Sequence, residues 1–135
     1  MSSKSRFLEA LESRNVKAAK KIIDKPSFQV NATALPPGSN VQVGFYPVLC
    51  AVAESGLVEV AKALLEKEGV QVDAEIGCNG MTALYLACQE GYHDMAALLI
   101  SHGADVNKYT RDDIPCVPLH MACQYGHTRV AKLLL

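Results

Sequence analysis

The sequence predicts an all-α solenoid, in which short helix–turn–helix units joined by β-turn or hairpin loops stack into one domain over residues 1–135. Two observations predict this fold. Gly56, Gly91 and Gly126 recur 35 residues apart, and a pair of leucines follows each of them at a similar distance. The segments flanking each glycine carry apolar residues three and four positions apart, which is the spacing of an amphipathic helix. Helices this short are stable only when they pack on neighbours, so the fixed period indicates a repeat array.

The first unit covers about residues 5–31. Ser5 is placed to cap a first helix, and Val16 starts the apolar face of a second one. Arg14 and Asn15 stand where the later units have their glycine. Lysines crowd the second helix and no turn precedes the first. These features are typical of a terminal repeat, because one of its faces meets water instead of a neighbour.

An extended loop is predicted at residues 32–44. It is rich in turn-forming residues, and the segment 41–43 alternates like a short strand. The connection is longer than its equivalents in the later units. A loop that is unusually long in a regular array is often functional, yet extra loop length also costs little closure entropy. A functional finger and a tolerated insertion therefore both stay open.

The clearest unit runs from about residue 80 to residue 107. Thr82 is placed to cap its first helix, because a threonine hydroxyl can accept from a backbone N–H of the first turn. Gly91 separates the two helices, and Gly103 follows the second one, where a left-handed residue is most easily a glycine. The units at about 45–73 and 115–135 follow the same plan, the last after a longer linking turn.

These motifs resemble the ankyrin repeat. Val117-Pro118-Leu119-His120 is similar to the Thr-Pro-Leu-His stretch of that family, residues 82–85 match it more loosely, and residues 103–107 repeat its Gly-Ala-Asp-Val-Asn loop. The resemblance covers about residues 5–135 and implies a β-turn plus two helices in each unit. In the family the threonine and histidine together brace the turn. No unit here has both, so we expect an array less rigid than a consensus one.

The resemblance also implies a binding surface. In ankyrin-like stacks the turn tips and the exposed residues of the first helices form a concave face that usually engages protein partners. The family positions in this sequence are Tyr46, Glu54, Ser55, Cys78, Asn79, Met81, Gln89, Glu90, Asp113, Ile114, Cys116, Gln124 and Tyr125. Tyr46, Met81, Ile114 and Tyr125 are the expected anchors, because aromatic and flexible apolar side chains supply most contact energy. The alternative is that some of them, Tyr46 and Ile114 first, only cover the core at the turns.

Asn107 raises a separate possibility. The string that ends in Asp105-Val106-Asn107 resembles the acceptor sequence of an asparaginyl hydroxylase that modifies ankyrin-repeat loops. Asn107 is therefore a candidate hydroxylation site. The alternative is a purely structural asparagine that bridges adjacent loops.

Metal binding and catalysis are not favoured. Four possible zinc ligands follow one another at spacings of four, three and four residues: Cys116, His120, Cys123 and His127. This spacing would suit a zinc site only on a continuous helix. The repeat pattern instead breaks the helix at Gly126 and makes Cys123, like Cys88, face the core. The sequence has no glycine-rich phosphate loop, no His-Glu-x-x-His motif and no nucleophile elbow. We expect no metal, no cofactor and no enzymatic activity.

Composition narrows the partner class and the compartment. The net charge is −1, but residues 1–25 hold seven Lys/Arg and three Asp/Glu. This basic segment is either a solvated outer face or a contact surface for an acidic partner or a membrane headgroup, and with Phe7 as its one aromatic residue it does not favour nucleic acid. No apolar run reaches the ~18–20 residues of a membrane span. Five cysteines without a disulfide pattern indicate a reducing, intracellular compartment, cytoplasmic and/or nuclear.

The sequence thus predicts a non-catalytic module that binds a protein or peptide partner on a concave face. The last residues, Leu133, Leu134 and Leu135, are not followed by a capping unit, so we expect either the N-terminal part of a longer ankyrin-repeat protein or an open end that pairs with another chain. Two alternatives stay open. One is an architectural unit that self-assembles through these leucines, and the other is a regulatory domain of a larger enzyme.

Overall fold

The computed structural model describes residues 3–28, 47–77 and 79–135. In these ranges the chain forms eight helices that follow one another in pairs. They are α1 (Ser3–Glu12), α2 (Val16–Ile23), α3 (Val48–Ser55), α4 (Val58–Leu65), α5 (Ala83–Glu90), α6 (His93–Ser101), α7 (Pro118–Gln124) and α8 (Thr128–Leu134). The predicted loop at 32–44 and the predicted site residues Tyr46 and Cys78 lie outside the described residues.

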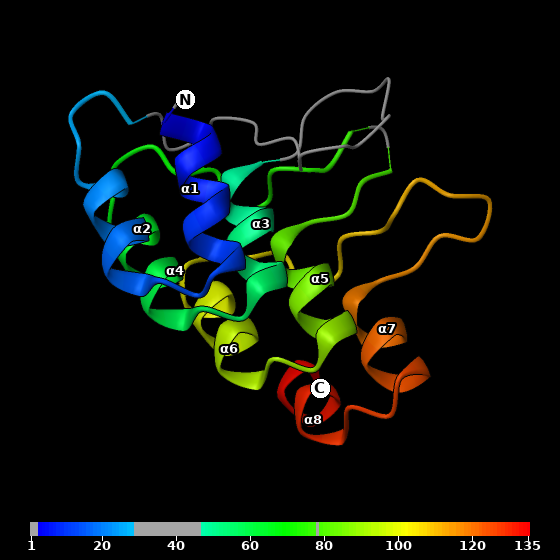
Figure 1. Ribbon diagram of the computed structural model, residues 1–135. Coiled ribbons are helices and arrows are strands. Elements are labelled where there is room, and N and C mark those ends of the chain that lie inside the picture. Colours follow the sequence, from blue (N-terminus) through cyan, green and yellow to red (C-terminus); the bar gives the residue numbers. More distant parts are fainter. Residues whose placement is uncertain (1–2, 29–46, 78) are drawn as a thin grey trace.

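The helices form two layers (Figure 1). The first helices of the pairs, α1, α3, α5 and α7, pack side by side in one layer, and the second helices, α2, α4, α6 and α8, form the other. Each unit contacts mainly the unit before it and the unit after it. The loop between α6 and α7 projects from the edge of the molecule, as Figure 1 shows. The predicted all-α solenoid of stacked helix–turn–helix units is confirmed.

The core lies between the two layers and runs through all four units. Val60, Met95 and Val130 follow one another at the repeat period on the second helices, and each is at most 1% exposed. Leu49 and Leu84 occupy one equivalent position on the first helices and are also buried. Each such side chain contributes roughly 1.5–3 kcal/mol on burial. Helices of seven to ten residues would not be stable in isolation, so this shared core holds the array together.

Helix starts agree with the sequence at one predicted position and differ at another. The Thr82 Oγ1 accepts from the Tyr85 N–H at 3.3 Å, which confirms the predicted cap of α5. Helix α1 begins at Ser3, so Ser5 lies inside its first turn and the prediction of Ser5 as its cap is wrong. Neither Ser3 nor Lys4 breaks a helix, and each added residue gains a backbone hydrogen bond.

The turns within the pairs require left-handed residues. Arg14 has φ +57°, so it takes the conformation that glycine takes in the later units, as predicted. Gly91 has φ +78°, and a β-carbon there would lie 2.5 Å from Nδ1 of His127. Only glycine satisfies both the backbone angle and this close approach, because a side chain would have to displace the ring.

The loops between α4 and α5 and between α6 and α7 are hairpins that bond to one another. Ile76 and Met81 form an isolated antiparallel bridge, and the Thr110 N–H donates to the Cys116 carbonyl at 2.9 Å. One contact crosses between loops, since Oδ1 of Asp73 accepts from the Asp105 N–H at 3.0 Å. These bonds give the array its predicted hairpin loops.

An ion cluster also ties the last two loops together. The Glu75 carboxylate lies 2.9 Å from Nζ of Lys108 and 2.8 Å from Arg111. The Glu75 side chain is 17% exposed, so the contact is partly shielded from solvent. The Arg111 N–H also donates to the Asn79 carbonyl at 2.8 Å, which connects the same two loops through the backbone.

Candidate functional site

Six of the predicted binding residues form two lines across the array. They end the first helices at equivalent positions, one repeat period apart, and the first helices pack side by side. Each of the six is exposed or half-buried. The first line is Glu54, Gln89 and Gln124, and the second is Ser55, Glu90 and Tyr125. The structure therefore brings these residues together on one edge of the first layer.

The fourth unit and the loop that leads to it expose three large apolar side chains. Ile114 is 78% exposed and Tyr125 is 53% exposed, so neither of them covers the core. Tyr109, which the family positions do not include, is 63% exposed at the start of the same loop as Ile114. Apart from Leu135, these are the large hydrophobic residues that the described part of the chain exposes. The sequence reasoning missed Tyr109, and the unusual length of this linking turn is the signal that could have located it.

Tyr85 lies in the first turn of α5. It is 7% exposed, and burial is the main cause that raises the pKa of its hydroxyl. Cys116, Asp112 and Tyr125 raise the pKa further, because their negative forms would disfavour a tyrosinate nearby. The Tyr85 hydroxyl is thus close enough to the α6–α7 loop and to the turn after α7 for charges on these segments to affect its pKa.

Two other predicted residues have different surroundings. Met81 is half-buried, pairs with Ile76 in the bridge and packs against the core, so it serves mainly to cover the core at the turn. Asn79 is exposed, and its carbonyl accepts from Arg111. Asp113 is exposed beside Ile114. Of the predicted anchors in the described residues, Ile114 and Tyr125 are the ones that face solvent.

Cys123 corrects a prediction. It is exposed, whereas Cys88 at the equivalent position is completely buried. The two cysteines differ in burial because their helices have different neighbours, although the two units share one sequence pattern. Helix α5 packs between α3 and α7, while α7 contacts α5 alone among the first helices. Burial raises the pKa of the Cys88 thiol to about 12, so that thiol stays protonated at neutral pH.

The two histidines considered for zinc have structural partners. His120 accepts from the Val117 N–H through Nδ1 at 3.1 Å, which caps the start of α7. The His127 Nε2–H donates to the Gln89 carbonyl at 2.9 Å and so joins the third and fourth units. Among the residues that the structure describes, no three His, Cys, Asp or Glu side chains are grouped to hold a metal ion.

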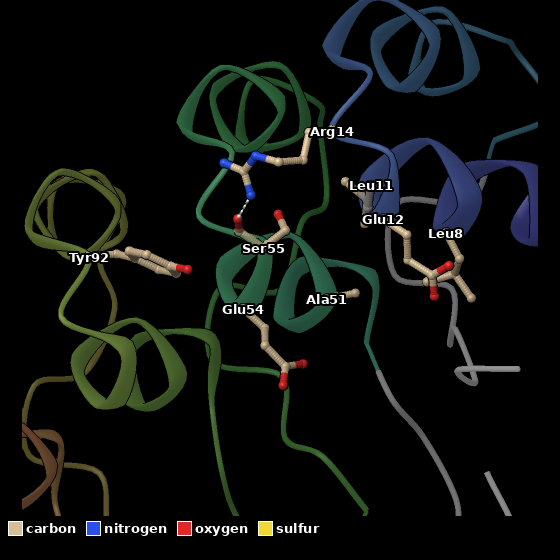
Figure 2. A pocket seen from close by; sticks show the side chains of 8 residues that line it. All are labelled: Leu8, Leu11, Glu12, Arg14, Ala51, Glu54, Ser55 and Tyr92. Atoms are coloured by element: carbon tan, nitrogen blue, oxygen red, sulfur yellow. Dashed lines mark hydrogen bonds between the residues drawn. The ribbon is translucent and has the colours of Figure 1, made fainter. Parts of the chain in front are cut away.

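A hollow between α1 and α3 is a feature that the sequence reasoning missed (Figure 2). It has a volume of about 350 Å³. Its lining comes from α1, from the turn after α1, from α3 and from the turn between α5 and α6, and comprises Leu8, Leu11, Glu12, Arg14, Ala51, Glu54, Ser55 and Tyr92. Two of the predicted binding residues, Glu54 and Ser55, form part of it. The hollow extends the same edge of the first layer to the first unit.

Asn107 is exposed in the loop between α6 and α7. Its backbone N–H donates to Oδ1 of Asp105 at 2.9 Å within that loop. One of the bonds that join this loop to the preceding one runs from the Asp105 N–H to Oδ1 of Asp73. A purely structural role of Asn107 stays a prediction.

None of the described helices, of which the longest has ten residues, has the length and apolar character to cross a membrane.

Comparisons with known proteins agree with this architecture. A family model for ankyrin repeats in three copies matches residues 7–110, and a model for many copies matches residues 86–135. Among similar proteins, the regulatory protein NPR6 of Arabidopsis thaliana is 31% identical over 105 residues, which is 77% of this chain and 22% of that protein. The potassium channel AKT2/3 of the same plant is 49% identical over 59 residues, 44% of this chain and 7% of the channel. The ankyrin repeat and SOCS box protein 11 of Danio rerio is 43% identical over 72 residues, 53% of this chain and 23% of that protein.

This chain therefore spans less than a quarter of the length of each of these relatives. The repeat motifs, the two helical layers and the family match over most of the chain lead to one assignment. Ankyrin repeats are generally protein–protein interaction modules and typically non-catalytic. The chain belongs to the ankyrin repeat family.

Proposed function

We propose that this chain binds a protein or peptide partner on the edge of its first layer, without catalysing a reaction. We call this surface the binding face and define it by the two lines of residues at the ends of α3, α5 and α7 together with the tip of the α6–α7 loop. The observation that carries the proposal is the exposure of Ile114 and Tyr125 on that face. Large exposed apolar side chains are expensive to leave in water and are typical of interfaces.

The binding face has the composition of an interface centre with a polar rim. Ile114, Tyr125 and Tyr109 supply apolar area in the fourth unit. Glu54, Gln89 and the other residues of the two lines supply polar groups across the second and third units. A partner would thus anchor on the fourth unit and extend along the lines, and a few anchors would carry most of the affinity. Tyr46 and Cys78 stay predicted members of this face.

The test uses a charge at each anchor. The double variant Ile114→Glu/Tyr125→Glu places two carboxylates where apolar contact is expected, and both positions are exposed enough that the fold should be kept. Met81 is left unchanged because it packs against the core. Proteins captured from a cytosolic extract by the wild-type chain and lost by the folded variant support the proposal.

Leu135→Glu is the matched control. Leu135 is 91% exposed, so the control makes the same apolar-to-acidic change away from the binding face. Circular dichroism verifies that each variant is folded. If the double variant keeps every partner that the control keeps, binding does not depend on Ile114 and Tyr125, and the proposed face is wrong.

Self-assembly through the end of the chain is a second candidate. The 91% exposure of Leu135, beside the half-buried Leu133 and Leu134, is the observation that favours it. Sedimentation equilibrium of the wild-type chain and of Leu134→Glu separates the two functions. A concentration-dependent dimer that the substitution abolishes would support self-assembly, whereas a monomer at all concentrations removes it.

A regulatory role within a larger enzyme is retained from the sequence interpretation. The relatives are several times longer than the matched region, and one is named a regulatory protein, which supports such a role for a repeat domain. Whether or not the chain is part of an enzyme, the binding face would act by holding a partner. The sequence of the complete transcript would show directly whether a catalytic domain accompanies the repeats.

We further propose that the chain works in a reducing compartment, the cytoplasm or the nucleus. The four cysteines of the described residues carry free thiols, and burial raises the pKa of Cys50 to about 12.

Asn107 keeps its candidate role as a hydroxylation site, supported by its exposure in the loop. Mass spectrometry of native protein would reveal the added oxygen atom on its peptide, and an unmodified peptide alone would argue against the modification.

A further inference from the structure

The hollow between α1 and α3 combines an apolar floor with acidic side chains. Leu8 and Ala51 are half-buried, Leu11 is 5% exposed, and all three belong to or pack against the core. They form an apolar strip along the hollow. In Figure 2 the Glu12 side chain extends from α1 beside Leu8, and Glu54 extends from α3 next to the same strip.

Arg14 is the basic residue among the described residues that line the hollow, and it lies at the end opposite to the two carboxylates. The Arg14 guanidinium donates to the Ser55 carbonyl at 3.0 Å, so it sits at the carboxyl end of α3, where backbone carbonyls favour a positive charge. Figure 2 shows that Glu54 points away from this guanidinium. Within the described residues Glu12 forms no ion pair with the chain. The acidic end of the hollow is thus spatially separate from its basic end.

The turn between α5 and α6 closes the hollow at one side. The ring of Tyr92 lies against Gly56, where an added β-carbon would come within 2.8 Å of it. The absence of a β-carbon at Gly56 therefore leaves room for the ring, which forms one wall of the hollow together with Ser55. A pre-formed wall lowers the entropy cost of binding a flexible side chain.

We propose that this hollow takes a lysine or arginine side chain of the partner protein. The aliphatic stem would cover Leu8, Leu11 and Ala51, and the cationic group would lie between the carboxylates of Glu12 and Glu54. Long basic side chains pair in this way with surfaces that are apolar along the stem and acidic at the tip. The inference rests on the proposed function and adds the chemistry of one contact at the first-unit end of the binding face.

The experiment titrates isotope-labelled full chain with two short peptides and follows the backbone amide signals by NMR. The probes are acetyl-Leu-Arg-Leu-amide and its charge-reversed counterpart, acetyl-Leu-Glu-Leu-amide. The arginine peptide should shift the amides of Glu12, Ala51 and Glu54, and the glutamate peptide should leave them in place. Two exposed ion pairs together should account for about a fivefold difference in affinity.

Matched variants connect the binding to the two carboxylates. Glu12→Gln/Glu54→Gln removes both charges from the hollow and should weaken the arginine peptide by about fivefold. Glu66→Gln/Glu68→Gln changes the net charge equally at exposed positions after α4 and should bind as the wild type does. Equal weakening by both pairs would show a general charge effect and overturn the proposal. So would preferential binding of the glutamate peptide, because the hollow would then serve an anion at Arg14.

The outcome is distinguishable from that of the proposed function. If the natural partners are kept by Glu12→Gln/Glu54→Gln but lost by Ile114→Glu/Tyr125→Glu, the binding face stands and the basic side chain does not occupy the hollow. If the arginine peptide binds as expected while the anchors prove dispensable, the hollow stands and the binding face must be redrawn toward the first unit.

Discussion

Replacement of Gly91 by alanine tests how tightly one repeat fits against the next. Gly91 and Gly126 occupy equivalent turns with φ of +78° and +71°. A left-handed conformation costs an ordinary residue roughly 1–2 kcal/mol, so both substitutions carry that penalty. They differ in surroundings: a β-carbon at Gly126 meets nothing within 4 Å, whereas at Gly91 it would lie 2.5 Å from the His127 ring.

The additional cost at Gly91 follows from the displaced ring. The ring would have to move by about an ångström to restore van der Waals contact, which breaks the bond from its Nε2 to the Gln89 carbonyl. Losing that hydrogen bond and part of the ring packing should cost about 1–2 kcal/mol. We therefore expect Gly91→Ala to lower the free energy of unfolding by about 2–4 kcal/mol and Gly126→Ala by about 1–2 kcal/mol.

A double-mutant cycle with His127→Ala isolates the contact. Urea denaturation of the wild type, both single variants and the double variant, followed by circular dichroism, gives the four free energies of unfolding. Once the ring is gone, Gly91→Ala should cost no more than Gly126→Ala does in the wild type. Costs that add within about 0.5 kcal/mol would refute the reasoning, since the ring would then not constrain the glycine.

Four further predictions concern stability and thiol chemistry. Val117→Thr supplies the hydroxyl that the fourth unit lacks at its helix start and should raise the free energy of unfolding by about 1 kcal/mol, measured in urea. Glu75→Gln should lower it by about 1 kcal/mol, and the loss should shrink in high salt because the ion cluster is partly exposed. Iodoacetamide should label Cys123 in the native chain at pH 8 but reach Cys50 and Cys88 only on unfolding. Because their pKa values lie near 12 in the folded chain and near 9 when unfolded, the unfolded chain loses these protons first, and their contribution to stability should fall as the pH rises from 9 to 12.

The fold was predictable because the core residues recur in the sequence at the repeat period. Val60, Met95 and Val130 fall on one line in the sequence and one line in the structure. Cys123 shows where this reasoning ends. Its unit has the same sequence pattern as the unit of Cys88, but its burial depends on whether another first helix packs beside it. The periodicity of the sequence predicts the structure of a single unit, whereas the burial of a residue also depends on which helices pack beside that unit.

The candidate site was predictable to the same extent. Family positions located Tyr125 and Ile114, because a repeat position maps to a fixed place on the array. They could not locate the hollow beside α1, since Leu8, Ala51 and Tyr92 come from three units and share no motif. Tyr109 was missed for another reason: it lies in a linking turn whose length departs from the family, so no family position corresponds to it.

The turns explain how an array with incomplete helix caps can still hold a defined face. Arg14 donates to the Ser55 carbonyl across the first interface, and His127 donates to the Gln89 carbonyl across the third. Each of these bonds ends on a residue of the binding face, or on its backbone. These bonds therefore help the core to fix one unit against the next, and they also help to fix the spacing of the exposed side chains. Selection for a partner would act on the turns together with the face, because a shifted turn would move the binding residues without changing any of them.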